Sequence, residues 1–331
     1  MTRSFDVLIT GGAGFIGAGL ARRFLADGMS VACLDIAPFS RLQPHPALTC
    51  IRGDVRDEGT VDELVASASR VVHLAAVVGV DDYMADPALV LDINVLGTRL
   101  VLQACLRHAR PVLLTSSSEV YGINQEVLTE GSARMYGSYR SPRWSYALSK
   151  AVGEQYAQAY GRDGLAHITI RFFNVYGPGL DSPGSGRVIS KFLGHIQDGT
   201  PLPLVDGGHA VRSYCYVEEA IDATYRLALE AGPDSLLNGR AYNVGRADPV
   251  SVRELAERII ALSGHSAGVV DVAGGAFFGE RFEDIPRRVP DVSALSAAIG
   301  FEATIDLDEG LRRTLAAVDL LAEGGVKGGE R

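Results

Sequence analysis

Short runs of aliphatic and β-branched residues alternate with stretches of helical periodicity along the first half of the chain. The apolar runs lie at residues 5–10, 30–35, 48–51, 70–75 and 111–115, and several of the segments between them carry apolar residues at helical spacing. Continuous apolar runs are typical of strands that are buried on both faces, as in a parallel sheet covered by helices on each side. The pattern therefore predicts an α/β fold with a doubly wound parallel sheet.

The pattern loosens after residue 172 and predicts a second, smaller lobe. Stretches rich in glycine and proline occupy residues 176–186 and 201–208. Helices are expected over 188–197 and 217–230, and a further helix begins at Ser251, because Ser251 and Glu254 have the spacing of a capping box. The expected division of the chain is a first domain over 1–172, a C-terminal lobe over mainly 173–321, and a flexible tail over 322–331.

Composition and charge exclude several classes of protein. The 331 residues are 47% hydrophobic and 21% charged, an ordinary balance for a folded protein of about two domains. The formal net charge is −9 and no run of basic residues is present, so nucleic acid is not expected as a partner. The four cysteines are scattered and predict neither a disulfide framework nor a metal site. The start of the chain does not resemble a signal peptide, and the apolar stretch 71–80 is too short to cross a bilayer, so we expect a cytoplasmic protein without a membrane partner.

A glycine-rich motif, TGGAGFIG, directly follows the first expected strand and opens the next helix. Its spaced glycines are Gly11, Gly14 and Gly17. Such a turn brings backbone N–H groups and the end of a helix close to a pyrophosphate. Asp35 ends the second expected strand, 18 residues after Gly17, where a carboxylate can bind ribose hydroxyls and disfavour a 2′-phosphate. The motif therefore predicts NAD as the cofactor.

Asp54 and Val55 follow the third expected strand and are candidates for contact with the adenine edge. The alternative for them is a loop carboxylate beside a core valine. His73, which ends another expected strand, is interpreted as a structural histidine with satisfied hydrogen bonds.

Tyr146 and Lys150, in the sequence SYALSK, are spaced to lie on one face of a helix. An ammonium group beside a phenol favours the phenolate, which a tyrosine needs if it is to remove a proton at neutral pH. The same spacing also occurs on ordinary amphipathic helices, where it gives a surface lysine and a half-buried tyrosine.

A cluster of hydroxyls and a carboxylate, TSSSEVYG, follows the last expected strand of the first domain. In a doubly wound fold this position is the carboxyl edge of the sheet, where ligands bind. The candidate catalytic residues here are Ser117, Ser118 and Glu119. The alternative is a set of local hydrogen bonds that shape the turn, an alternative that is favoured for Ser116.

These motifs together resemble those of the extended short-chain dehydrogenase/reductases, the NAD-dependent epimerase/dehydratase family of nucleotide-sugar enzymes. They recur in order over residues 5–321 as TGGAGFIG, Asp35, GDV, HLAA, NVLGT, TSSSEVYG, SYALSK, RFFNVYGP and RRVPD. The resemblance implies a Rossmann-type domain over 1–172 that binds NAD and holds the catalytic residues, and a lobe over 173–321 that mainly binds the nucleotide sugar. It also implies oxidation at sugar C4, a UDP-sugar or other nucleotide-sugar substrate, and a homodimer. The cofactor contacts that it adds are Phe15, Ile16, Leu74, Ala75, Ala76 and Asn94.

Within the family, the Ser118–Glu119 pair is similar to that of UDP-glucuronic acid decarboxylases and of GDP-mannose dehydratases. The segments DDYMADP, SPRWSYALSK, GRVISKF and EDIPRRVPD also resemble those of the decarboxylases. Two residues depart from the usual decarboxylase pattern: Gly179 stands where arginine is usual, and Ser117 where threonine is usual. The resemblance thus implies decarboxylation of UDP-glucuronic acid to UDP-xylose, to UDP-4-keto-pentose, or to both. The alternatives are a UDP-glucuronate or UDP-hexose 4-epimerase, an NDP-hexose 4,6-dehydratase, and an NAD-binding regulator without turnover.

The resemblance also assigns roles to individual residues. Tyr146 removes the C4 hydroxyl proton, and Lys150 binds the nicotinamide ribose and stabilises the phenolate. Ser117 helps to polarise the C4 ketone, while Ser118 and Glu119 orient the sugar carboxylate and help to reprotonate C5. Arg212 is expected near the reacting centre, with a surface salt bridge as the alternative. The further expected substrate contacts are Tyr83, Asn174, Arg187 and Arg288, for which core packing, loop capping and solvated cations are the alternatives.

Overall fold

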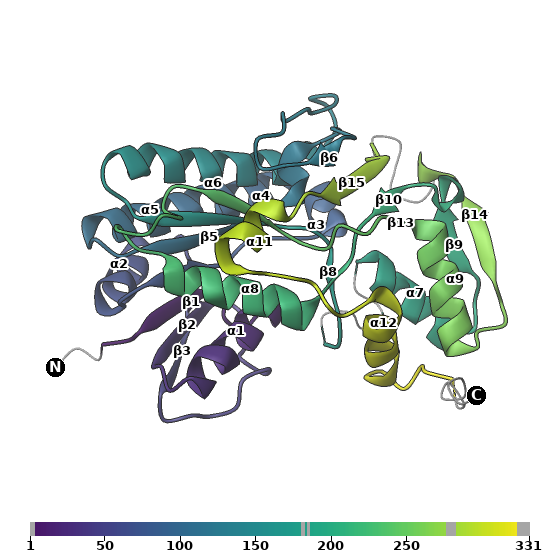
Figure 1. The fold of residues 1–331 in the computed structure, drawn as a ribbon, viewed down its shortest axis with the longest axis horizontal. Coiled ribbons are helices and arrows are strands. Elements are labelled where there is room, and N and C mark those ends of the chain that lie inside the picture. Colours follow the sequence, from purple (N-terminus) through teal and green to yellow (C-terminus); the bar gives the residue numbers. More distant parts are fainter. Residues whose placement is uncertain (1–3, 180–182, 184–185, 276–282, 323–331) are drawn as a thin grey trace.

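A parallel sheet of seven strands forms the centre of the computed structural model, which describes residues 4–179, 183, 186–275 and 283–322 (Figure 1). The strand order is β12-β7-β5-β4-β1-β2-β3, and every neighbouring pair is parallel. The strands are β1 (Val7–Thr10), β2 (Val31–Asp35), β3 (Leu48–Arg52), β4 (Val71–His73), β5 (Val112–Ser117), β7 (His167–Phe172) and β12 (Ala241–Val244). The predicted doubly wound α/β fold is confirmed.

Helices cover both faces of this sheet, as the continuous apolar strand runs predict. One face carries α1 and α8, which contact each other, and the opposite face carries α2, α5 and α6 (Figure 1). Successive residues of β1 serve the two faces in turn, because Val7 and Ile9 pack into the core beside α1 whereas Leu8 packs into the core beside α2. The bounds are α1 (Phe15–Ala26), α2 (Glu58–Ser67), α3 (Val80–Ala85), α5 (Thr98–Arg107), α6 (Trp144–Arg162) and α8 (Val217–Glu230).

One long helical stretch runs through α4 (Pro87–Leu91), the π-helical turn η1 (Asp92–Gly97) and α5. By length and composition alone the stretch Pro87–Arg107 could cross a membrane, whereas the sequence had suggested no such segment. Half of its most apolar window is buried inside the fold. It packs against α2 and α6, so its apolar composition is also that of a core helix.

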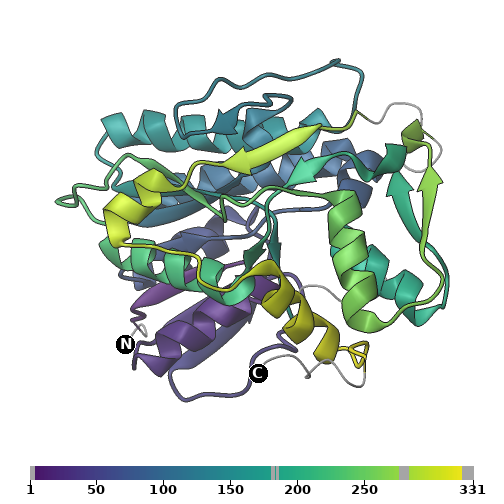
Figure 2. The same cartoon turned by 45° about the vertical axis from the view of Figure 1, so that its right-hand side comes forward.

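The C-terminal lobe is built from small sheets and helices that lie beyond one end of the central sheet (Figure 2). A four-stranded sheet has the order β13-β10-β15-β6, and two strand pairs, β11-β8 and β14-β9, complete the lobe. Its strands are β6 (Val127–Leu128), β8 (Val175–Tyr176), β9 (Leu202–Val205), β10 (Val211–Arg212), β11 (Cys215–Tyr216), β13 (Val250–Ser251), β14 (Val269–Val272) and β15 (Arg287–Pro290). Its helices are α7 (Val188–Gln197), α9 (Val252–Ser263) and α12 (Leu307–Ala316), whereas α11 (Ser293–Ile299) packs against β12 and α8 of the central layers. The predicted helices over 188–197 and 217–230 and the Ser251–Glu254 capping box are confirmed.

The chain crosses between the two parts more than once, so position 172 does not separate two consecutive units. β12 and α8 follow residue 172 and yet belong to the layers of the central sheet, while β6 precedes it and pairs with β15 of the lobe. The predicted flexible tail, 322–331, lies outside the described residues except for Ala322.

Candidate active site

The glycine motif forms a turn that leaves room for a ligand at the carboxyl edge of β1. Gly11 has φ +76°, and a Cβ atom there would lie 2.7 Å from the Ala75 nitrogen, so the turn requires glycine. Gly14 caps α1 without a side-chain hydrogen bond to the first turn. The N–H groups of that turn can therefore meet an anion, as a dinucleotide pyrophosphate requires.

Asp35 ends β2 beside this turn. Its carboxylate accepts hydrogen bonds from the Ala13 and Ala37 backbone N–H groups, at 3.0 and 2.9 Å. Those contacts fix a carboxylate where a ribose would lie next to the glycine turn, and the glycine cradle and Asp35 together fit NAD. Phe15 and Ile16 begin α1 at the same edge.

The other expected cofactor contacts line this edge in different ways. Leu74, Ala75 and Ala76 leave β4 directly opposite Gly11, and all three are partly exposed. Asp54 is held by Arg56, at 2.7 Å, and Val55 is buried against Gly97.

Asn94 is hydrogen-bonded inside the fold. Its side chain is buried and bonds the backbone N–H and C=O of Val77, at 2.8 and 3.1 Å, and the Ser149 hydroxyl, at 3.1 Å. These bonds link the loop after β4 to helix α6, and the expected contact of Asn94 with the cofactor stays a prediction. His73 is the structural histidine that the sequence indicates, since Thr10 and Thr98 bond its two ring nitrogens at 2.7 and 2.9 Å.

Tyr146 and Lys150 lie one turn apart on α6, and both are buried. Burial raises the pKa of Tyr146 to about 12, although a hydrogen bond with Ser117 acts in the opposite direction. Burial lowers the pKa of Lys150 to about 8, and its ammonium donates to the Thr115 carbonyl at 3.0 Å. The three candidates Ser117, Tyr146 and Lys150 therefore meet at the carboxyl end of β5.

Glu119 is the centre of a buried ionic cluster beside these residues. It lies in the 3₁₀ turn η2 (Ser118–Tyr121), and its own backbone N–H donates to the Ser117 hydroxyl at 3.2 Å. Arg288 donates to Glu119 Oε1, and Arg143 lies 3.4 Å from Oε2. Burial alone would raise the pKa of Glu119, but the guanidinium groups of Arg288, Arg143 and Arg212 lower it to about 2.

This ionisation bears on the expected role of Glu119 in the reprotonation of C5, which stays a prediction. Glu119 is ionised at neutral pH, so it would have to take up a proton before it could donate one to C5. The structure favours an orienting and electrostatic role for Glu119. Ser118, its neighbour, is fully buried in the same turn.

Tyr83 lies over Tyr146, with ring centroids 6.0 Å apart and ring planes 15° from parallel. Its hydroxyl is buried and has no hydrogen-bond partner among the described residues. Burial is the largest cause that raises the pKa of Tyr83, and the negative charge of Glu119 raises it further. The hydroxyl therefore keeps its proton. A buried, protonated donor beside Tyr146 and Glu119 fits the predicted contact with a substrate.

The remaining expected substrate residues converge from the lobe. Arg212 on β10 is paired with Asp284 at 3.0 Å, and Arg288 on β15 also reaches the Asn174 side-chain oxygen at 3.3 Å. Asn174 in turn donates to the Ser213 carbonyl. Arg187 precedes α7 and donates to the Val175 carbonyl. The structure thus brings Arg212, Arg288 and Asn174 together with Glu119, and none of the three is a solvated surface group.

Sequence reasoning missed one residue of this cluster, Arg143. It stands in the quoted segment SPRWSYALSK, three positions before Tyr146, so its spacing to the candidate base was a readable signal. Its charge partner, Glu119, is distant along the chain, and no spacing in the sequence predicts that the two residues pair.

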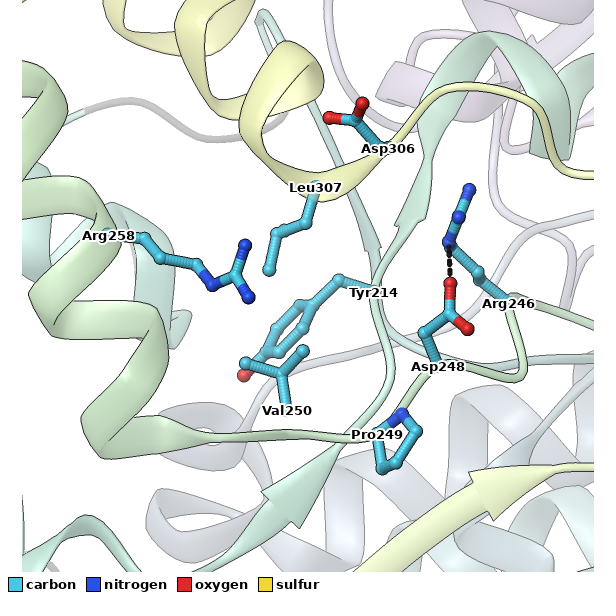
Figure 3. A pocket seen from close by; sticks show the side chains of 8 residues that line it. All are labelled: Tyr214, Arg246, Asp248, Pro249, Val250, Arg258, Asp306 and Leu307. Carbon is cyan, nitrogen blue, oxygen red and sulfur yellow. Dashed lines mark hydrogen bonds and ion pairs between the residues drawn. The ribbon is translucent and has the colours of Figure 1, made fainter.

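A separate pocket lies in the lobe, between α9, the start of α12 and the loop after β12 (Figure 3). Its arginines are already paired: Arg246 with Asp248 at 2.5 Å, and Arg258 with Asp308 at 2.9 Å. No candidate site residue lines it. The chemistry therefore belongs to the cluster around Tyr146 and Glu119.

Comparisons with known proteins agree with this architecture. The model of the NAD dependent epimerase/dehydratase family matches residues 7–245. The chain is 35% identical, over 93% of its length and 96% of the relative, to UDP-N-acetyl-alpha-D-glucosaminuronate decarboxylase of Bacillus cytotoxicus. It resembles the structure of a dTDP-glucose 4,6-dehydratase from Streptomyces venezuelae with bound NAD, with 28% identity, a TM-score of 0.82, and coverage of 94% of this chain and 96% of that one. It also resembles UDP-N-acetylglucosamine 4-epimerase from Methanobrevibacter ruminantium in complex with UDP-N-acetylmuramic acid, with 28% identity, a TM-score of 0.82, and coverage of 95% and 98%.

The match with the family model and the glycine cradle lead to the same class, a Rossmann-type enzyme that uses NAD. The chain belongs to the NAD-dependent epimerase/dehydratase family of extended short-chain dehydrogenase/reductases, and NAD is its cofactor.

Proposed function

We propose that this protein decarboxylates a UDP-uronic acid, with UDP-glucuronic acid as the substrate and UDP-xylose, UDP-4-keto-pentose or both as products. The observation that carries the proposal is the placement of the ionised Glu119, held by Arg288 and Arg143, beside Tyr146 and Tyr83. Guanidinium groups are the side chains that bind carboxylates best in proteins. The 35% identical relative is named as a decarboxylase of a UDP-uronic acid, which supports the same reaction class.

The residues of the site divide the chemistry between them. NAD, when bound, supplies reversible two-electron oxidation at sugar C4. Tyr146 accepts the proton of the C4 hydroxyl as the phenolate; burial favours its neutral phenol, and the Lys150 ammonium one turn away, charged at pH values below about 8, favours the phenolate. The arginines around Glu119 orient the C6 carboxylate.

Oxidation at C4 makes the substrate a β-keto acid, which explains why no further catalyst is needed for loss of carbon dioxide. The C5–C6 bond breaks, and its electron pair moves into the C4 ketone to give an enolate. The negative charge gathers on the C4 oxygen, within reach of the donors Tyr146 and Ser117. A proton taken up from solvent reaches C5 and gives the keto-pentose. Return of the two electrons to C4 as hydride, with return of the proton from Tyr146 to the C4 oxygen, gives the pentose.

Two other reactions remain candidates because structural relatives are named for them. The relative from Methanobrevibacter ruminantium is a 4-epimerase, and the one from Streptomyces venezuelae is a 4,6-dehydratase. Both reactions also begin with oxidation at C4, so the glycine turn, Tyr146 and Lys150 fit all three. Glu119 within its pair of arginines disfavours the 4-epimerase, and the 35% identical relative, named as a decarboxylase, favours decarboxylation over dehydration.

Mass spectrometry of the nucleotide sugar tests the proposal. Purified protein with NAD is incubated with UDP-glucuronate, with its 2-acetamido analogue and with UDP-glucose, and the Tyr146→Phe variant serves as control. Loss of carbon dioxide from UDP-glucuronate supports the proposal, and loss from the analogue alone moves the substrate to the 2-acetamido sugar. Unchanged mass with inverted C4 identifies an epimerase, and loss of water from a hexose identifies a dehydratase.

The exposed apolar residues of two neighbouring helical segments support a homodimer as part of this proposal. They are Leu89 and Leu91 on α4, Leu96 on η1, and Leu148 and Val152 on α6, each 38–42% exposed. Because α4 packs against α6, these residues form a surface that a second copy can cover.

A further inference from the structure

Arg143 lies at the start of the helix that carries Tyr146, in the turn that precedes it. The Ser141 and Pro142 carbonyls accept the backbone N–H groups of Trp144 and Ser145, at 3.4 and 3.1 Å, so the turn is already helical at this point. Arg143 and Tyr146 are therefore three positions apart on one helical face. The side chain of Arg143 is 4% exposed, which is far below the usual exposure of an arginine.

The buried guanidinium of Arg143 is directed at Glu119 and not at solvent. Its Nη2 lies 3.5 Å from Oε1 and 3.4 Å from Oε2 of Glu119, so it faces both carboxylate oxygens. Arg288 donates to Oε1 from β15, in the C-terminal lobe. Glu119 is thus held by one cation from the catalytic helix and one from the lobe.

We propose that Arg143 is a positioning residue of the proposed decarboxylation, one that fixes the Glu119 carboxylate relative to Tyr146. This inference rests on the proposed function for its catalytic consequence. A single arginine on Oε1 leaves the carboxylate free to rotate about its last bond. A second guanidinium, whose Nη2 lies 3.5 and 3.4 Å from the two oxygens, restrains that rotation.

The charges around Glu119 show why the second arginine matters. From the elements packed against it, Glu119 faces Arg143 before α6, Arg288 on β15, Arg212 on β10, Tyr83 on α3 and Tyr146 on α6. The two tyrosines are neutral, so the arginines alone keep the buried carboxylate ionised. Without Arg143, one of the charges that offset the desolvation of the buried Glu119 is lost. The pKa of its carboxyl group therefore rises.

The test uses the full-length protein with Arg143→Met, Arg143→Lys and, as a matched control, Arg140→Met. Arg140 is an exposed arginine of the same loop that contacts Tyr139. The pKa of Glu119 is measured by NMR of protein labelled with ¹³C at the glutamate carboxyl carbons, with the signal assigned by its loss in Glu119→Gln. The kcat and KM for the UDP-uronate that the protein turns over are measured as a function of pH.

In R143M we expect the pKa of Glu119 to rise by at least about one unit, and the acidic limb of the kcat profile to move with it. We expect kcat to fall by about tenfold to a hundredfold, as misplacement of a group at the reacting centre does. R143K, which keeps the charge but not the planar fork, should restore most of the pKa and part of kcat. R140M should match the wild type in both.

If the pKa of Glu119 is the same in R143M as in the wild type, the inference is wrong, whatever the activity of the variant. A raised pKa with full kcat overturns the role in the reaction. If R143M does not fold, R143K provides the test. A wild-type kcat in R143K would show that the reaction does not need the guanidinium group of Arg143. If the wild type turns over no UDP-uronate, the proposed function fails, and the NMR titration still shows whether Arg143 anchors Glu119.

Discussion

Arg212 and Arg288 are direct neighbours across the parallel strands β10 and β15, where they stand in register. Both side chains are buried, so two like charges lie side by side in a region of low polarity. Each is offset by its own carboxylate, Arg212 by Asp284 and Arg288 by Glu119. The arrangement places two paired arginines of the lobe beside the cluster of Glu119 and Tyr146, which supports the proposed binding of an anionic nucleotide sugar there.

Replacement of Arg288 by methionine should destabilise the fold as well as the site. Glu119 then loses one of its buried partners, and breaking a buried ion pair in this way costs about 3–5 kcal/mol. Urea unfolding measures the loss, with Arg287→Met as control because Arg287 points to the opposite face of β15. The double variant E119Q/R288M should be more stable than R288M alone; equal stability of the two would show that the pair is not coupled.

Replacement of Tyr146 by phenylalanine should lower kcat by about a hundredfold or more, because the group that accepts the C4 proton is lost. The ring packing against Tyr83 is retained, so the melting temperature should change little. Turnover and NAD binding are measured side by side, with Tyr156→Phe on the same helix as control. Normal turnover in Y146F would exclude the phenol as the base.

Replacement of Asp35 by alanine should weaken NAD binding. The carboxylate is held by the Ala13 N–H group at the glycine turn, and loss of charged hydrogen bonds to a ribose costs about 1.5–3 kcal/mol, or about tenfold to a hundredfold in Kd. Calorimetry with NAD and NADP gives both affinities, and the exposed Asp234→Ala is the control. A preference for NAD that survives in D35A would contradict the assignment.

His73 should make the protein less stable as the pH falls below about 6.5. Burial lowers its pKa to about 3 in the folded protein, so the unfolded chain binds the proton first. The stability that neutral His73 provides is fully present above pH 6.5 and is lost toward pH 3, by up to about 1.4 kcal/mol per pH unit. Urea unfolding at pH 7, 6 and 5 should show a steeper decline for the wild type than for His73→Gln, and the partly exposed His195→Gln should keep the wild-type slope.

The double variant L148E/V152E should convert the proposed dimer to a monomer. Both side chains are about two-fifths exposed on one face of α6, and carboxylates there oppose burial against a second copy. Analytical ultracentrifugation gives the mass, and Leu236→Glu, at a position 87% exposed, is the control. An unchanged mass in L148E/V152E would place any dimer contact elsewhere.

The sequence by itself determined those features that depend on local order along the chain. Apolar runs predicted β1 to β5 of the central sheet but not β7 and β12, the glycine turn predicted the cofactor edge, and the Ser251–Glu254 spacing predicted a helix start. The spacing of Tyr146 and Lys150 placed both on one helical face. Each of these features involves residues a few positions apart, where backbone geometry fixes the outcome.

The tertiary structure alone decided which distant residues share a site. Glu119 and Arg288 are 169 positions apart and meet because β15 pairs with β10 and β6 in one small sheet. The return of β12 to the central sheet and the approach of Arg143 to Glu119 likewise follow from packing between segments. Strand pairing and side-chain packing act between distant residues, so they also set the ionisation of Glu119, which cannot be predicted from the order of residues along the chain.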